Sequence, residues 1–249
     1  MSKRIDVLWT GGWDSTYRVL HAAIVEKYTI YPHYIIDFER KSSLRELQAI
    51  SEIKNELEKI DPEARRRIKK TLITPISEIK SDSSISNSWL RLKSQAHLGG
   101  QYDWLARFAA QEGLENLELS VHVDDKAYFF LQGKVKEDSD GHWKLKDDAA
   151  GDEVIFQRFV FPLLEISKTE MRLNATKKGF LKALEKSWFC FNPHNGMPCG
   201  LCNPCIYAVE EGMGYRLPKE AVNRYKARRY YTFWRRAKSA IKKLSAPNE

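Results

Sequence analysis

Hydrophobic and polar positions in the first half of the chain follow two alternating patterns. Short apolar runs, typical of buried strands, are each followed by a longer stretch with apolar residues at helical spacing. The runs predict strands at Ile5–Trp9, Ile30–Ile36, Thr71–Pro75 and Leu114–Val123, and helices near Ser15–Lys27 and at Leu44–Ile60 and Gln101–Glu112. This alternation predicts an α/β fold, a Rossmann-like parallel sheet with helices on both faces.

The pattern weakens in three later stretches. Residues 77–88 are polar and serine-rich, and Gly133–Glu153 is polar and turn-rich, which predicts an insertion or a mobile loop. An apolar run, Phe159–Leu164, then leads into a helix, where Ser167 and Glu170 have the spacing of a capping box.

The stretch "VLWTGGWDST", Val7 to Thr16, places a glycine-rich turn between the first strand and the first helix. Such a turn directs backbone N–H groups and the positive end of the helix dipole at one point, which favours an anion such as phosphate. Glycine lets the backbone approach the ligand closely, and Ser15 adds a hydroxyl donor. For two adjacent glycines alone, an ordinary turn is the alternative. In open α/β sheets, ligands bind at the carboxyl ends of the strands, where this turn would lie.

All four cysteines, Cys190, Cys199, Cys202 and Cys205, lie within sixteen residues, in the pattern C-x8-C-x2-C-x2-C. The two C-x2-C steps let thiolates reach one tetrahedral ion at roughly 2.3 Å. A cytosolic chain disfavours disulfides, whereas a redox pair or an iron–sulfur cluster stays open. Structural Zn²⁺ is the preferred interpretation, with a binding energy on the order of 10 kcal/mol to fold this segment.

Length and composition bound the architecture. The chain has 249 residues, of which 43% are hydrophobic, enough for one large domain or a domain with a small appendage. It contains no apolar run near the ~18 residues of a membrane span, and its first residues, "MSKR", do not resemble a signal peptide. We therefore expect a soluble cytoplasmic protein that does not bind a membrane.

The net charge of +8 is concentrated at the C-terminal end. From residue 215 onward, eleven Lys and Arg residues stand against two Glu, so the first 214 residues sum to about −1. Aromatic residues are interleaved with the bases, which suits a nucleic-acid strand. The same pattern suits a helix that docks its aromatic side on the protein, or an acidic protein partner.

The segment from Thr10 to Ser15, T-G-G-W-D-S, resembles the S-G-G-x-D-S loop of the PP-loop ATP pyrophosphatases, with threonine in place of the first serine. A Walker A loop would need G-x4-G-K-[ST]. Within that family, "PLLEISKTEM" and "SWFC…PCGLCNPC" are similar to the 7-cyano-7-deazaguanine synthases (QueC). "DFERKSSLREL" (Asp37–Leu47) resembles their D-Y-G-Q-R-H-x-x-E-L segment. The resemblance runs from Ile5 to about Gly212 and is most specific at its two ends.

The resemblance implies a HUP-type PP-loop domain over residues 1–185 and a zinc-binding segment over 186–214. The basic aromatic helical tail over 215–249 is an addition to the family pattern. The resemblance also implies ATP, Mg²⁺ and Zn²⁺ as cofactors, and a homodimer. Asp14 would help to place Mg²⁺ and pyrophosphate, Lys168 would reach the phosphates, and Ser15 would act with them in catalysis. The implied nucleotide-binding residues are Trp9, Thr10, Gly11, Gly12, Trp13, Asp14, Ser15 and Lys168.

The chain departs from the synthases where their substrate pocket is expected. Their G-R-N-T segment is replaced by Gly99-Gly100-Gln101-Tyr102, and their G-V-N-A-x-D by Ser120-Val121-His122-Val123-Asp124-Asp125, without a D-x-R-P-E-F equivalent. The pocket candidates, each with an ordinary surface role as the alternative, are Asp37, Arg40, Gln101, His122 and Asp125.

Three functions follow from this comparison. The first is an adenylating ligase that activates 7-carboxy-7-deazaguanine or a similar acid and joins it to nitrogen. Ammonia as acceptor would give an amide or nitrile, as in queuosine biosynthesis, and a protein amine would give a conjugate, since related proteins occur in bacterial antiviral defence clusters. The second is a tRNA-modifying enzyme, although thiolation generally needs a catalytic cysteine or a sulfur-bearing cluster, and no cysteine lies outside the four-cysteine group. The third is a nucleotide-binding partner protein without catalysis.

Overall fold

The computed structural model describes residues 3–96 and 98–228. The chain divides into two compact units: the first comprises Met1–Glu39 and Glu46–Trp188, and the second comprises Arg40–Arg45 and the chain from Phe189 onward. Most of the predicted basic tail, from residue 229, lies outside the described residues.

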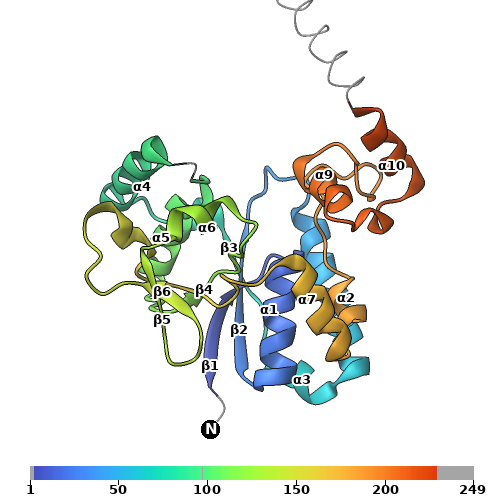
Figure 1. Cartoon of the computed structure of the whole chain (residues 1–249), viewed down its shortest axis with the longest axis horizontal. Coiled ribbons are helices and arrows are strands. Elements are labelled where there is room, and N and C mark those ends of the chain that lie inside the picture. The colour runs from blue at the N-terminus through green and yellow to red at the C-terminus, as the bar shows by residue number, and fades with distance from the viewer. Residues whose placement is uncertain (1–2, 97, 229–249) are drawn as a thin grey trace, which may run out of the picture. The chain divides into compact units, whose positions relative to one another are not determined.

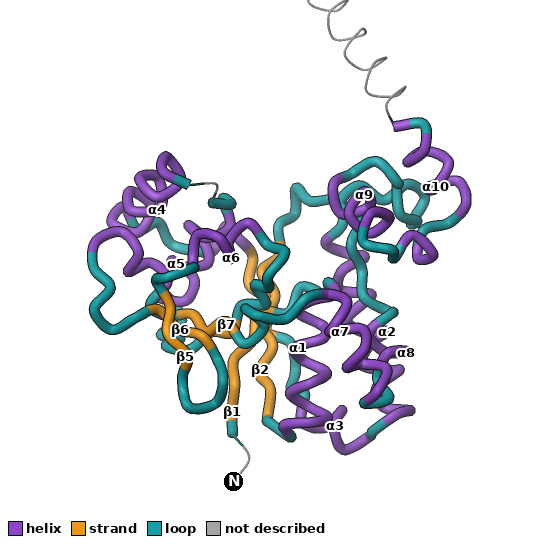
Figure 2. Tube along the Cα trace, viewed as in Figure 1, coloured by secondary structure: helices purple, strands orange, loops and turns teal. Residues whose placement is uncertain are grey.

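The first unit contains a seven-stranded sheet with the order β3-β2-β1-β4-β7-β6-β5 (Figures 1 and 2). The first five strands in this order are parallel, and β6 and β5 join them antiparallel. The Rossmann-like parallel arrangement predicted from the apolar runs is thus confirmed, within a sheet that is mixed at one edge. The strands are β1 (Arg4–Leu8), β2 (Thr29–Ile36), β3 (Leu72–Pro75), β4 (Leu117–Glu118), β5 (Val135–Glu137), β6 (Trp143–Leu145) and β7 (Phe159–Phe161).

Helices cover both faces of this sheet, as predicted. Figure 1 shows α1, α3 and α7 on one side and α4, α5 and α6 on the other. Their apolar sides bury a core in which Phe108, Phe156 and Phe159 are almost fully enclosed. The helices of this part of the chain are α1 (Trp13–His21), α2 (Ser43–Ile60), α3 (Pro62–Arg67), α4 (Ser83–Gln95), α5 (Gln101–Gln111), α6 (Lys126–Leu131), α7 (Lys168–Lys177) and α8 (Leu181–Leu184). A π-helix (Ala22–Glu26) follows α1, and 3-10 turns lie at Ile76–Glu78 and Gly151–Phe156.

Two polar stretches are more regular than their composition indicated. The serine-rich stretch begins α4, because the Asp82 carboxylate accepts hydrogen bonds from the backbone N–H groups of Ser84 and Ile85 at the helix start. The predicted loop at 133–153 contains the β5–β6 hairpin. Its turn is closed by Asp138, which accepts from the N–H of His142 at 3.0 Å.

The predicted fourth strand is much longer than the observed one. Only Leu117–Glu118 pair as β4, although Leu119 and Val121 beyond them are buried. The apolar pattern therefore predicted the buried residues correctly but overestimated how many of them pair with neighbouring strands. The capping box at α7 is confirmed: Ser167 Oγ accepts from the Glu170 N–H, and the Glu170 carboxylate accepts from the Ser167 N–H at 2.8 Å.

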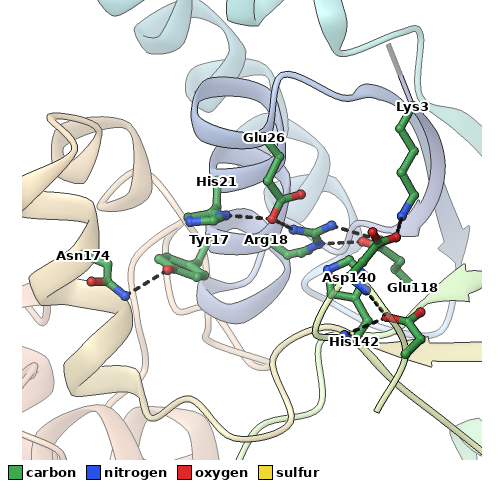
Figure 3. Close-up of polar contacts among 10 residues, drawn as sticks. Lys3, Tyr17, Arg18, His21, Glu26, Glu118, Asp140, His142 and Asn174 are labelled. Carbon is green, nitrogen blue, oxygen red and sulfur yellow. Dashed lines mark hydrogen bonds and ion pairs between the residues drawn. The ribbon is translucent and has the colours of Figure 1, made fainter. Parts of the chain in front are cut away.

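A buried ion-pair network joins α1 to the sheet (Figure 3). The Arg18 guanidinium donates to both carboxylate oxygens of Glu118 on β4, at 2.6 and 3.0 Å, and its third nitrogen donates to Glu26 at 2.7 Å. The side chains of Arg18 and Glu118 are only 2% and 3% exposed. Glu26 also contacts His21 Nδ1 at 3.1 Å.

The second unit contains α9 (Asn203–Glu210), a 3-10 turn (Gly214–Arg216) and α10 (Lys219–Lys226). Arg224 on α10 donates to the Cys199 carbonyl at 2.7 Å and to the Pro198 carbonyl at 3.3 Å. In the part of the chain that the structure describes, no helix combines the length and apolarity needed to cross a membrane.

The Arg18–Glu26 contact predicts an acid-dependent loss of stability. Burial alone would raise the pKa of Glu26, but hydrogen bonds from His21 and Arg18 outweigh it and lower that pKa from 4.5 to about 2. The ionised carboxylate therefore stabilises the fold fully above pH 4.5, and this contribution is lost as the pH falls toward 2. In urea unfolding between pH 2 and 7, Glu26→Gln should flatten the pH dependence of the unfolding free energy, whereas Glu63→Gln on exposed α3 should not. An unchanged slope in Glu26→Gln would contradict this assignment.

Candidate functional site

The loop from Thr10 to Ser15 joins β1 to α1 at the carboxyl end of the parallel strands. Its two hydroxyls contact each other: Thr10 Oγ1 lies 3.1 Å from Ser15 Oγ, which also accepts from the Thr10 N–H at 3.3 Å. The Gly12 N–H points to Thr10 Oγ1 at 3.4 Å. A hydroxyl at residue 10 thus closes the loop on itself, and threonine supplies it where the family pattern has serine.

Gly11 allows the loop to pack closely against α2. Its φ is +71°, and a Cβ there would lie 2.8 Å from the Glu46 carbonyl oxygen. On the other side, the Trp188 N–H donates to the Gly11 carbonyl at 2.8 Å. Below the loop, Trp9 is fully buried and its indole N–H donates to Thr16 Oγ1 at 3.1 Å, and Trp13 is buried as well. The loop is thus held by its close packing against α2, by the hydrogen bond from Trp188 and by the buried side chains of Trp9 and Trp13.

The amino terminus of α1 is suited to an anion. Gly12 stands at the N-cap position, and no side chain caps the first turn there. The positive end of the helix dipole therefore faces the loop without a capping side chain, which is the arrangement that binds phosphate groups in other proteins. The same turn carries Asp14, whose Oδ1 is buried and accepts no hydrogen bond from the described residues.

His122 brings Asp14 together with the segment that follows β4. Its Nε2 lies 3.6 Å from Asp14 Oδ1 and 3.6 Å from Asp125 Oδ1. Its Nδ1 accepts from the Asp124 N–H at 3.3 Å, and its side chain is only 2% exposed. The meeting follows from strand register: Val7 on β1 pairs with Glu118 on β4, so the segments after both strands begin at the same level.

The electrostatics of Asp125 connect two further residues to this cluster. Burial raises the pKa of Asp125 above its usual value; His122 and Lys168 oppose this, and the Asp14 carboxylate adds to it. Lys168 is the first residue of α7, which begins directly after its capping Ser167. Burial also raises the pKa of Tyr102, and the Asp125 carboxylate adds to the effect. Tyr102 was not predicted as a site residue; its only sequence signal is its place beside Gln101.

The structure places the other pocket candidates separately. Asp37 lies just after β2, where its Oδ1 accepts from the Glu39 N–H at 2.9 Å. Arg40 belongs to the second unit and lies over the Phe191 ring at 5.0 Å. Gln101 is exposed at the start of α5. A role for these three residues in substrate binding stays a prediction.

The four cysteines form a compact cluster in the second unit. Their Sγ atoms all lie within 4.8 Å of one another; Cys202 and Cys205 are separated by 3.5 Å, Cys190 and Cys202 by 3.8 Å, and Cys199 and Cys205 by 3.9 Å. Backbone N–H groups point at the sulfurs: Cys199 N–H donates to Cys190 Sγ at 3.2 Å, and Cys202 N–H to Cys199 Sγ at 3.3 Å. Such donors stabilise thiolate charge, so these residues can hold a metal ion.

The scan against protein-family models and the search of curated proteins find no match. Among solved structures, the chain is similar to the U34-tRNA thiolase NcsA from Methanococcus maripaludis, which was solved with its [4Fe-4S] cluster. The TM-score is 0.40 and the identity 13%, over 93% of this chain and 71% of that one.

A 4-thiouridine synthetase, solved in complex with RNA and ATP, matches with a TM-score of 0.38 and 14% identity. That match covers 91% of this chain, which spans about half (53%) of the synthetase chain. At 13% and 14% identity, neither likeness extends to activity.

The close approach at Gly11 predicts a position-specific effect of substitution. An alanine at positive φ costs roughly 1–2 kcal/mol at any position, and at Gly11 its Cβ would also overlap the Glu46 carbonyl. Gly113 is a matched control, with a φ of +63° and open space for 4 Å around the place that a Cβ would take. We expect Gly11→Ala to lower the urea-unfolding free energy by clearly more than Gly113→Ala. Equal losses in the two variants would contradict a tightly packed loop.

Proposed function

We propose that this protein is an ATP-dependent adenylating enzyme that activates a carboxylate and transfers the acyl group to nitrogen. The observation that carries the proposal is the meeting of Asp14 and Asp125 at His122 beside the Thr10–Ser15 loop, with Lys168 near enough for its charge to act on Asp125. A phosphate seat, carboxylate oxygens and a lysine in one place are the groups that ATP cleavage between the α and β phosphates requires. The loop resembles the PP-loop, which supports the same activity.

In this reaction, the substrate carboxylate attacks the α-phosphorus of ATP. An O–P bond forms, the bond to the bridging oxygen breaks, and pyrophosphate leaves with that electron pair. Both reactants are anions, so the N–H groups of the loop and the Lys168 ammonium would offset the charge that gathers at the α-phosphate. Asp14 Oδ1, buried and without a hydrogen bond from the described residues, suits a hard cation, and Mg²⁺ bound there would screen the triphosphate.

The second half-reaction needs an amine. Its nitrogen attacks the acyl carbon, the bond from that carbon to the AMP oxygen breaks, and AMP leaves while the nitrogen loses a proton. We propose 7-carboxy-7-deazaguanine or a similar acid as substrate. Ammonia would give the amide and, after a second activation, the nitrile; an amine of a protein partner would give a conjugate.

A second candidate, modification of a nucleic acid, is favoured by the charge of the second unit. In its described part, eight Lys and Arg side chains stand against three Glu. Three arginines there lie over aromatic rings: Arg40 over Phe191, Arg216 over Phe189, and Arg228 over Tyr225. Such pairs bind phosphates and stack on bases. Thiolation through a free catalytic cysteine is disfavoured because all four cysteines lie in the cluster.

For the cysteine cluster we propose one structural Zn²⁺. A tetrahedral ion with Zn–S distances of ~2.3 Å separates its sulfurs by ~3.8 Å. This is close to the 3.5–3.9 Å that separate Cys202 from Cys205, Cys190 from Cys202 and Cys199 from Cys205. A four-iron cluster would place its irons and sulfides among the thiolates and push them further apart. Cys190, Cys199, Cys202 and Cys205 would be the four ligands, with no position left for a substrate.

The adenylation proposal is tested with α-labelled ATP, Mg²⁺ and 7-carboxy-7-deazaguanine, with and without ammonium. We expect AMP that depends on the acid, and a fall in its rate of about 10²–10³-fold in Lys168→Ala, the range for removing one preorganised charge-stabilising donor. Lys177→Ala, in the last turn of the same helix, should leave the rate unchanged. No AMP with this acid would exclude that substrate, and failure to bind ATP would exclude the proposed activity.

The zinc proposal is tested by the metal content of the purified protein. We expect one zinc per chain, released by a strong chelator, and little zinc in Cys205→Ser. His194→Ala is the control: His194 lies near the cluster in sequence but is exposed and outside the ligand group, so this variant should keep its zinc. Iron with acid-labile sulfide and visible absorption would instead show an iron–sulfur cluster.

A further inference from the structure

Three separate segments supply the candidate site. Asp14 lies in the first turn of α1, His122 and Asp125 follow β4, and Lys168 begins α7. Charged groups that act on one phosphate must be held to within fractions of an ångström of their working positions. The fold therefore needs a device that fixes α1 against both other segments.

Two consecutive residues of α1 make these connections (Figure 3). Arg18 donates to Glu118 of β4 at 2.6 and 3.0 Å, and Tyr17 OH accepts from Asn174 Nδ2 of α7 at 3.3 Å. Arg18 follows Asp14 by four residues, so both project from the same side of α1. Glu118 precedes His122 by four residues. The Arg18–Glu118 pair is therefore a second link, deeper in the fold, between the same two segments that meet at Asp14 and His122.

The Arg18 guanidinium group is bound by carboxylates from two different segments, Glu118 and Glu26. Its Nη1 donates to Glu26 at 2.7 Å, at the end of the π-helix that continues α1. Widened turns of this kind are rare and occur mostly at functional sites. With three nitrogens engaged and 2% of the side chain exposed, Arg18 has one available orientation. That orientation fixes the rotation of α1 about its axis.

Stability alone gives no reason for a charged pair at this place. A well-packed apolar pair often stabilises a core as much as, or more than, a buried ion pair. A bidentate arginine–carboxylate contact adds direction, because two parallel N–H···O bonds define both the distance and the angle between the groups. The pair thus specifies how α1 sits on β4.

We propose that Arg18 and Glu118 are positioning residues for the nucleotide site. Their contact sets the spacing of Asp14 from His122 and Asp125, while Tyr17 and Asn174 set that of Lys168. This inference rests on the proposed function only for its ATP readout; the coupling between the pair and the two loop segments is a property of the fold.

The first test compares Arg18→Lys with Arg158→Lys. Lysine keeps the charge and loses the two-pronged geometry. Arg158 pairs with Glu115, an exposed residue just before β4, and is the matched control. We expect Arg18→Lys to weaken ATP–Mg²⁺ binding at least tenfold by calorimetry and to speed amide hydrogen exchange at residues 10–16 and 119–125. Arg158→Lys should leave both within twofold. Unchanged exchange in both segments would overturn the proposal.

The second test separates positioning from stability. This test uses the Glu26→Gln background, which removes the carboxylate that would otherwise lose its Arg18 partner. In that background, Arg18→Met with Glu118→Leu replaces the pair by apolar side chains of similar length, so the fold is kept. We expect this double variant to retain the fast exchange and the weak ATP binding of Arg18→Lys. Full recovery of both would show that the pair only stabilises the core and would overturn the proposal.

The exchange readout also keeps the two hypotheses distinct. If the wild-type chain binds no ATP, the proposed function fails, and exchange at residues 10–16 and 119–125 still decides the role of the pair. If ATP binds normally in Arg18→Lys and in the double variant, the adenylation proposal stands and the positioning role fails.

Discussion

The in-register pairing of β1 with β4 is the constraint on which the candidate site depends. Asp6 pairs with Leu117 and Val7 with Glu118, so two segments more than one hundred residues apart leave the sheet at the same level. The Thr10–Ser15 loop follows one strand and His122 follows the other. A shift of one residue would turn Glu118 to the other face of the sheet, away from Arg18. The buried ion pair therefore fixes the register that assembles the site.

Charge balance is the second constraint. Asp14 and Asp125 approach the same imidazole, and their mutual repulsion contributes to the raised pKa of Asp125. A polyphosphate entering beside them would meet more negative charge than the loop alone can offset. Lys168 supplies one compensating charge, and a divalent cation would supply the rest. In the proposed activity, this arrangement would couple nucleotide binding to a cation, and such a cation would satisfy the buried Asp14 oxygen to which no described residue donates.

The sequence predicted the parallel core and its order of elements, because buried strands and amphipathic helices each leave a local period. It also located the loop and the cysteine cluster, since glycine spacing and C-x2-C steps are local signals. The meeting of His122 with Asp14 left no such signal, because it arises from strand register. Tyr102, on α5, was missed because its proximity to Asp125 is a tertiary contact that also leaves no local pattern. The β5–β6 hairpin was missed because charged residues alternate with its buried positions, Val135 and Leu145, in strands only three residues long.

The cysteine cluster joins separate segments of the second unit, as the Arg18–Glu118 ion pair joins α1 to β4 in the first. Gly200, at a φ of +76°, packs so tightly that a Cβ would lie 2.0 Å from the Ala221 carbonyl of α10. Arg224, one turn further along α10, donates to the carbonyls of Cys199 and Pro198. The backbone around Cys199 and Gly200, which would surround a bound metal, is therefore also the segment against which α10 packs. Binding energy from the ion would stabilise α10 as well as the cysteine cluster. The cysteines are in this way linked to the start of the basic segment that follows.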